Sequence, residues 1–192
     1  MKRLDYLMAK WRGIALLVLG RTVAAREVFD GMLQRWPDDP YALASRAHLL
    51  TEAGLTAAAL ADSHRLVALR PEHGATWFNH GYMLEASERF EEAEAAFRRA
   101  TELSPQLDRA WYGLGLVLIR RQRYEEAITA LKKNTELQPM SPYGWYQLAR
   151  VHVDRQQPEE AARIIRHLKG FEPKVAAQLE REIGVLAAPT KA

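Results

Sequence analysis

The sequence predicts an all-α protein, an α-solenoid of about five helix-turn-helix repeats followed by a C-terminal capping helix. Three observations lead to this prediction. Residue types recur at intervals of 34 positions, each interval contains two segments with the apolar spacing of a helix, and short polar stretches separate those segments. A repeat of this length is typical of solenoids, because each unit buries its apolar face only by stacking on its neighbours.

The period is most visible in proline, alanine and tryptophan. The prolines are Pro37, Pro71, Pro105, Pro139 and Pro173. The alanines are Ala25, Ala59, Ala93, Ala127 and Ala161, and the tryptophans are Trp77, Trp111 and Trp145. We therefore expect one array over residues 1–192, with repeats at about 6–39, 40–73, 74–107, 108–141 and 142–175.

The fourth repeat illustrates the two helices. Trp111, Leu114 and Leu118 follow helical spacing in its first half, and Ala127 and Leu131 do so in its second half. The proline that ends each repeat cannot continue a helix, so it closes the second one.

Small residues predict where the two helices of a repeat approach each other. Glycine inside a helix costs roughly 1 kcal/mol, so its presence in the first helix suggests tight packing. We expect the periodic alanine, for example Ala93 or Ala127, to lie opposite Gly81 or Gly115.

The segment after Pro173 predicts the capping helix, at about 175–187. Val175, Leu179, Ile183 and Leu186 lie along one helical face. A solenoid needs such an element to cover its last apolar face.

These repeats resemble the tetratricopeptide repeat (TPR) family. In the fourth repeat the matching residues are Trp111, Leu114, Gly115, Leu118, Ala127, Leu131 and Pro139. In the third they are Trp77, Gly81, Leu84, Ala93, Phe97, Ala100 and Pro105. The first two repeats match less well, with Ala9 and Leu43 in the tryptophan position. The resemblance implies a right-handed solenoid whose first helices line a concave groove that binds partner proteins.

Carried over residue by residue, the resemblance places a set of aromatic and polar residues in that groove. They are Tyr41, His48, Phe78, Asn79, Tyr82, Arg109, Tyr112, Leu116, Tyr143, Tyr146 and Arg150. Aromatic and arginine side chains are typical of binding hot spots. Asn79 and Arg109 are also the two residues that fit the five-residue carboxylate clamp of some TPR domains.

The first repeat differs from the others in that its groove positions are mainly apolar. They are Leu7, Lys10, Ile14 and Leu17, with the apolar Val18 beside them. Such a patch at the end of an array indicates self-association into a homo-oligomer, a partner subunit, or contact with a membrane.

Composition narrows the function further. The chain has no cysteine, and its 27 Lys/Arg against 24 Asp/Glu give a net charge of +3, too small for a nucleic-acid-binding face. Its histidines lack the spacing of a zinc site, and Asp62, Ser63 and His64, as neighbours on one helix, point in different directions and form no catalytic triad. We expect no catalytic residue, metal or cofactor.

The apolar run at residues 13–20 is too short to span a bilayer, and charged residues interrupt the approach to it, so we expect a cytoplasmic protein. The function predicted from the resemblance is a non-enzymatic scaffold or adaptor that binds a protein or peptide partner. The alternatives are a structural protein that assembles through its N-terminal helix, or an accessory subunit of an enzyme or membrane-associated complex.

Overall fold

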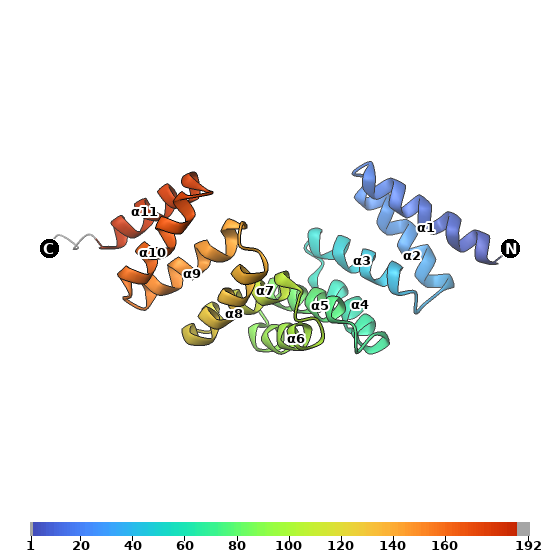
Figure 1. Ribbon diagram of the computed structural model, residues 1–192. Helices are drawn as coiled ribbons and strands as arrows, with labels where there is room; N and C mark the ends of the chain where they lie inside the picture. Colours follow the sequence, from blue (N-terminus) through green and yellow to red (C-terminus); the bar gives the residue numbers. More distant parts are fainter. Residues whose placement is uncertain (1, 188–192) are drawn as a thin grey trace. The chain divides into compact units, whose positions relative to one another are not determined.

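The computed structural model describes the backbone of residues 2–187 and the side chains of residues 3–184, so the predicted packing of Leu186 lies outside the described side chains. The described residues form eleven α-helices and no strand (Figure 1). They divide into two compact units, the first ending at Ser104 and the second beginning at Pro105. The all-α prediction is confirmed.

Unit 1 contains α1 (Lys2–Val18), α2 (Thr22–Arg35), α3 (Pro40–Glu52), α4 (Thr56–Leu69), α5 (Gly74–Ala86) and α6 (Phe90–Leu103). Unit 2 contains α7 (Asp108–Arg120), α8 (Tyr124–Leu137), α9 (Pro142–Asp154), α10 (Pro158–Lys169) and α11 (Pro173–Ala187). Within each unit, consecutive helices pack as pairs: α1 with α2, α3 with α4, α5 with α6, α7 with α8, and α9 with α10. The second helix of a pair also packs on the first helix of the next pair in the same unit, and α11 packs on both α10 and α9.

The turn between the two helices of a pair has the same backbone in every pair. Its left-handed residue is Gly20, Gly54, Glu88, Gln122 or Gln156, at φ between 58° and 72°. The next amide then donates to a carbonyl five residues back, as Arg123 N does to Leu118 O at 2.9 Å. This hydrogen bond closes the end of a helix, so every first helix stops at an equivalent residue.

In three repeats a hydrogen bond joins the periodic tryptophan to the periodic proline. The indole Nε1 of Trp77 donates to the carbonyl of Pro71 at 2.7 Å. Trp111 and Trp145 donate in the same way, each to the periodic proline six residues earlier, at 2.9 Å. The tryptophan therefore ties the start of a first helix to the loop that precedes it.

A close approach that recurs in three pairs joins a glycine of the first helix to a large side chain sixteen residues later. A Cβ added to Gly81 would lie 2.9 Å from the ring of Phe97, and one added to Gly115 would lie 2.7 Å from Leu131 Cγ. At Gly13 the nearest atom belongs to Phe29, at 2.7 Å. The large residue, and not the periodic alanine expected from the sequence, is thus the glycine's nearest side chain.

The periodic alanine has a different role, because it is buried within the pair. Its side chain is at most 1% exposed in all five pairs, at Ala25, Ala59, Ala93, Ala127 and Ala161. It therefore allows close packing without itself facing the glycine.

Two pairs lack the glycine. Ala47 takes the glycine position in the second pair, where the smaller Ser63 takes the position of Phe97. In the fifth pair Ala149 takes the glycine position and Ile165, as large as Leu131, takes the second. All four side chains are buried, so the second pair shows a compensating change and the fifth accommodates both the methyl group and a large side chain.

A partly buried group of one arginine and two aspartates connects three helices of unit 1. The guanidinium of Arg46 on α3 donates two hydrogen bonds of 2.7 Å to Asp62 on α4, and one of 2.8 Å to Asp30 on α2. Asp62 is 6% exposed, and the hydrogen bonds, those to Asp62 foremost, raise the pKa of Arg46. The charge is therefore retained inside the unit, because its partners replace the water it loses.

The close approach of glycine predicts the effect of adding one methyl group. Gly81→Ala should lower the free energy of unfolding by roughly 1–3 kcal/mol, because the new Cβ overlaps the ring of Phe97. Urea denaturation followed by circular dichroism measures the change.

Gly31→Ala is the matched control, since Gly31 is also inside a helix but its added Cβ meets nothing within 4 Å. It should raise stability by about 0.5–1 kcal/mol, because alanine favours a helix over glycine. Equal effects of the two substitutions would contradict the packing described here.

Candidate protein-binding surface

A hollow of about 250 Å³ lies among the helices α7, α9 and α11 of unit 2. These helices are neighbours in space, since α9 contacts both α7 and α11. Its lining residues are Tyr112, Pro142, Tyr143, Tyr146, Gln147, Val175 and Gln178. We call this site the tyrosine hollow.

The repeat positions two of its tyrosines. Tyr112 on α7 and Tyr146 on α9 are 34 residues apart and therefore occupy equivalent positions on neighbouring helices. Tyr143 precedes Tyr146 by three residues, which places both side chains on one side of α9. Pro142 begins α9, where its missing N–H costs no hydrogen bond.

Polar contacts hold Tyr146 in place. Its hydroxyl donates to Glu182 Oε2 at 2.7 Å, and the guanidinium carbon of Arg150 lies 5.8 Å from its ring centroid. Partial burial and the hydrogen bond to Glu182 raise the pKa of Tyr146, so the hydroxyl remains protonated at neutral pH. Hydrogen bonds from Tyr146 and then Gln178 lower the pKa of Glu182.

The structure brings together three of the residues that the sequence assigned to a groove, Tyr112, Tyr143 and Tyr146, and places Arg150 beside them. Leu116 and Arg109 lie on α7 but do not line this hollow, Leu116 half-buried and Arg109 exposed. Tyr143 is 69% exposed and so is accessible to a partner. The binding role of all six residues stays a prediction.

Sequence reasoning missed the contribution of α11. Val175 and Gln178 line the tyrosine hollow, and Glu182 accepts the hydrogen bond from Tyr146. The sequence predicts a cap in this segment and no part in binding. In the other repeats, the helix that follows the periodic proline is a first helix. The position of α11 directly after Pro173 therefore indicated that it could line the same surface as the first helices.

In unit 1 two of the predicted groove aromatics are engaged in packing. The ring of Tyr41 lies edge-on to Phe29 with centroids 6.0 Å apart, and the ammonium of Lys10 lies 4.4 Å from the Tyr41 centroid. Phe78 packs against Phe97, also at 6.0 Å. Tyr41 and Phe78 therefore contribute to the packing of unit 1, and their predicted binding role is a separate question.

The other predicted residues of unit 1 are more open. Asn79 is exposed and Tyr82 is 49% exposed, both on α5. His48 on α3 is exposed as well, with its Nε2 3.3 Å from a carboxylate oxygen of Glu52.

The apolar residues predicted for self-association have different surroundings. Leu7 and Val18 are exposed, at 40% and 81%, Ile14 is half-buried, and Leu17 packs against the core of the first two pairs. Their role in association stays a prediction.

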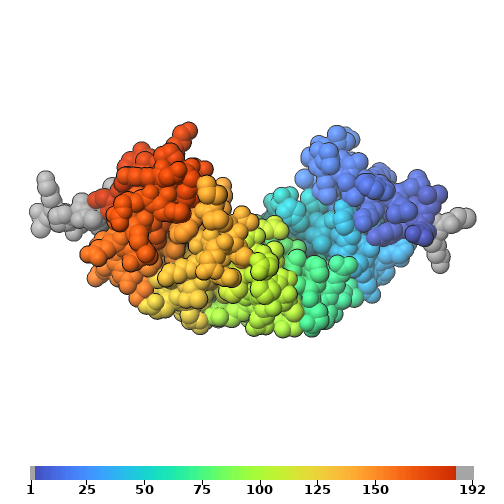
Figure 2. Space-filling view, in the orientation of Figure 1, coloured from blue at the N-terminus to red at the C-terminus, as the bar shows by residue number. Residues whose placement is uncertain are grey.

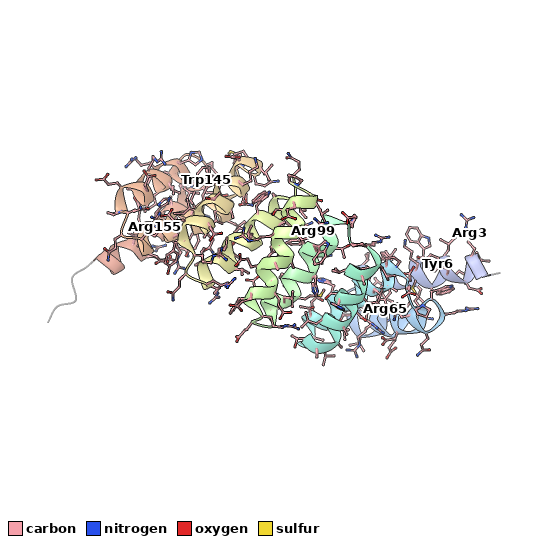
Figure 3. The ribbon with its side chains drawn as sticks, turned by 90° about the horizontal axis from the view of Figure 1, so that it is seen from below. Arg3, Tyr6, Arg65, Arg99, Trp145 and Arg155 are labelled. Carbon is pink, nitrogen blue, oxygen red and sulfur yellow. The ribbon has the colours of Figure 1, made fainter. Side chains whose placement is uncertain are left out.

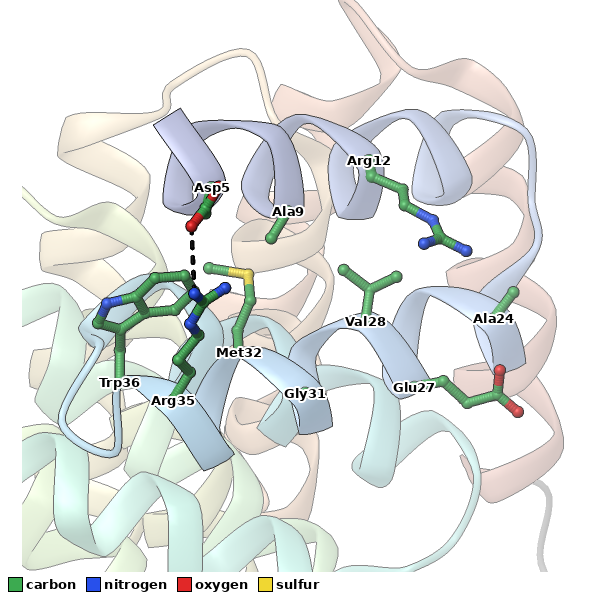
Figure 4. A pocket seen from close by; sticks show the side chains of 10 residues that line it. All are labelled: Asp5, Ala9, Arg12, Ala24, Glu27, Val28, Gly31, Met32, Arg35 and Trp36. Carbon is green, nitrogen blue, oxygen red and sulfur yellow. Dashed lines mark hydrogen bonds and ion pairs between the residues drawn. The ribbon is translucent and has the colours of Figure 1, made fainter. Parts of the chain in front are cut away.

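A second hollow, of about 320 Å³, lies between α1 and α2 (Figure 4). Its lining residues are Asp5, Ala9, Arg12, Ala24, Glu27, Val28, Gly31, Met32, Arg35 and Trp36. Arg35 donates to Asp5 at 3.1 Å across its edge. A hollow of about 400 Å³ lies at the equivalent positions of the fifth pair, and Lys132, Thr135 and Glu136 of the preceding helix α8 line one side of it. Among the described residues, no preceding helix lines the hollow of the first pair.

The histidine and serine of α4 and α5 form a hydrogen-bonded contact. Ser63 Oγ and His80 Nδ1 are 2.8 Å apart, and Ser63 is 2% exposed. The neighbouring Asp62 is bound to Arg46, so Asp62, Ser63 and His64 do not converge. Burial foremost, and then the charges of His64 and Arg89, lower the pKa of His80.

Two findings bear on other classes of site. Within the described side chains, no three or more His, Cys, Asp or Glu residues gather as metal ligands would. None of the helices that the structure describes combines the length and the apolar character needed to cross a bilayer.

The lowered pKa of His80 predicts a pH dependence of stability. Below its unfolded pKa of about 6.5, the unfolded chain binds a proton that the folded chain resists, so stability falls as the pH falls through this value towards the folded pKa. The measurement is urea denaturation at pH 7.5 and pH 5. His80→Gln should reduce the difference between the two. An unchanged pH dependence in His80→Gln would contradict the assignment.

Helix pairs that recur at a fixed period in the chain define a helical-repeat protein. The sequence of this chain identifies which family of helical repeats it contains. Models of the tetratricopeptide repeat match residues 2–40 and 45–108, residues 84–145, and residues 142–167. The chain belongs to the tetratricopeptide repeat family. No curated protein matches it in sequence.

Solved structures share the fold at low sequence identity. MamA 41-end from Desulfovibrio magneticus RS-1 is 21% identical with a TM-score of 0.78, over 92% of this chain and 96% of that one. PilF of Pseudomonas aeruginosa is 20% identical with a TM-score of 0.74, over 96% and 93%. YrrB, a TPR protein with an unusual peptide-binding site, is 17% identical with a TM-score of 0.74, over 88% of each chain.

Proposed function

We propose that the chain is a non-enzymatic scaffold that binds an extended segment of a partner protein along its first helices. The observation that carries this proposal is the tyrosine hollow, where three large side chains from two first helices surround an open apolar space. The similarity to YrrB supports it by analogy, since that protein has a peptide-binding site.

The size and lining of the hollow suit one anchoring side chain. Its volume of about 250 Å³ equals that of about eight water molecules at roughly 30 Å³ each. Tyrosine provides a large contact area at little cost in side-chain entropy, which is why it is common in binding surfaces. We infer that an apolar residue of the partner inserts between Tyr112 and Tyr146.

The chemistry of the hollow favours binding over reaction. The raised pKa of Tyr146 makes its hydroxyl a poor nucleophile at neutral pH. The carboxylate of Glu182 accepts hydrogen bonds from Tyr146 and Gln178, so it orients side chains. Both groups act as positioning residues.

The alternatives remain an assembly that forms through Leu7, Ile14, Leu17 and Val18, and an accessory role in a larger complex. Sedimentation equilibrium separates the first alternative from the scaffold, because a scaffold stays monomeric in the absence of its partner.

Affinity capture of a partner followed by calorimetry tests the proposal. Tyr112→Ala and Tyr143→Ala should each weaken binding about tenfold or more, as truncation of a central tyrosine commonly does. The same measurement with Arg109→Ala tests whether the adjacent part of α7 contributes.

Met140→Ala is the matched control. Met140 is 67% exposed, as open as Tyr143 and only three residues away, but it does not line the hollow. It should leave the affinity within about twofold. A greater loss in this variant than in Tyr143→Ala would place the binding surface elsewhere.

A further inference from the structure

The outer face of α1 is an apolar stripe. Leu4, Met8, Trp11 and Val18 are 62% to 81% exposed, and the exposed Ala15 completes the series. Their spacing of four and three residues places them in one row along the helix. The row extends for most of the helix, which is about 25 Å long at 1.5 Å per residue. We call these five residues the α1 stripe.

The rest of α1 anchors it to unit 1 without using the stripe. The Tyr6 hydroxyl donates to Asp39 Oδ2 at 2.9 Å, and Gly13 lies against the ring of Phe29. Leu16 and Leu17 pack on the core of the first two pairs. The stripe is therefore not needed to hold α1 in place, and α1 lies at the surface of unit 1 (dark blue in Figure 2).

Basic residues border the stripe. Residues 1–27 contain six Lys or Arg and two acidic residues, Asp5 and Glu27, and Arg35 pairs Asp5 at 3.1 Å. Arg3 and Arg12 are exposed and lie on opposite sides of the stripe around the helix, since successive residues are rotated by about 100°. Arg3 points away from the ribbon in Figure 3, and Arg12 lies at the edge of the hollow in Figure 4.

We propose that the α1 stripe docks on an anionic lipid surface, with α1 lying in the plane of the interface. An apolar helical face with basic residues at its borders combines burial of apolar area with attraction to anionic headgroups. Tryptophan is enriched at the interface between membrane and water, and Trp11 lies in the middle of the stripe. The side chains stand out from the helix, which suits a fluid surface better than a fixed partner.

Charge argues against a second copy of the chain as the occupant. Two stripes placed face to face would bring two sets of these basic residues together at short distance. Such like-charge contacts oppose association, whereas an anionic surface is attracted to both edges of the stripe. The proposal concerns unit 1 alone and does not depend on the tyrosine hollow.

Vesicle co-sedimentation of the full chain tests the proposal. One set of vesicles is phosphatidylcholine, and the other is phosphatidylcholine with phosphatidylglycerol. The chain should bind the second set, and its binding should weaken as salt is raised. Trp11→Glu should lower the partition coefficient about tenfold or more, because it places a charge within the apolar face. Arg3→Gln with Arg12→Gln should reduce the preference for anionic vesicles.

Met140→Glu is the matched control, because it makes the same charge change at a side chain of equal exposure in unit 2. It should bind as the wild type does, and circular dichroism should show equal helicity in all variants. Absence of wild-type binding, or equal binding by Trp11→Glu, would overturn the proposal. So would a wild-type dimer that Trp11→Glu dissociates while vesicles stay unbound, since the stripe would then contact a second copy.

Discussion

The close contact between the two helices of a pair is the constraint on which the remaining structure depends. Gly81 and Gly115 allow Phe97 and Leu131 to rest directly on the backbone of the first helix. Because the turn between the helices has the same backbone in each pair, this contact recurs at the equivalent residues of each such pair. Residues 34 positions apart then occupy equivalent places, and that equivalence brings Tyr112 and Tyr146 to one hollow.

The sequence could predict the fold because its period arises from specific contacts. Proline recurs because it cannot continue the preceding helix. Tryptophan recurs six residues later in three pairs, where its indole donates to the backbone carbonyl of that proline. The left-handed turn residue was harder to foresee. Gly20 and Gly54 are typical there, but Gln122 adopts the same backbone, which a non-glycine residue does at some cost. Nothing in its side chain indicates that conformation.

The site was only partly predictable because a repeat position defines a helix face but not its neighbours. Tyr143 and Tyr41 occupy equivalent positions of the repeat, yet Tyr143 borders an open hollow and Tyr41 packs against Phe29. On α1 the sequence drew attention to Leu17, which the structure packs into the core, rather than to Trp11. Charged residues lie on both sides of the exposed apolar row of α1, so the helix has no single polar face from which its outer side can be inferred.

The alternation between glycine and large residues sets the smallest part of this protein that can be exchanged. The second pair uses Ala47 with Ser63, whereas the third uses Gly81 with Phe97. A chimera that combined the first helix of one with the second helix of the other would bring a methyl group against a phenyl ring or leave a void. A crossover at the turn inside one of these pairs would therefore separate two residues that fit each other. The boundary between the fourth and fifth pairs carries a similar constraint, since a Cβ added to Gly144 of α9 would overlap Asn134 of α8. A segment moved by duplication or design must therefore carry both members of each such contact.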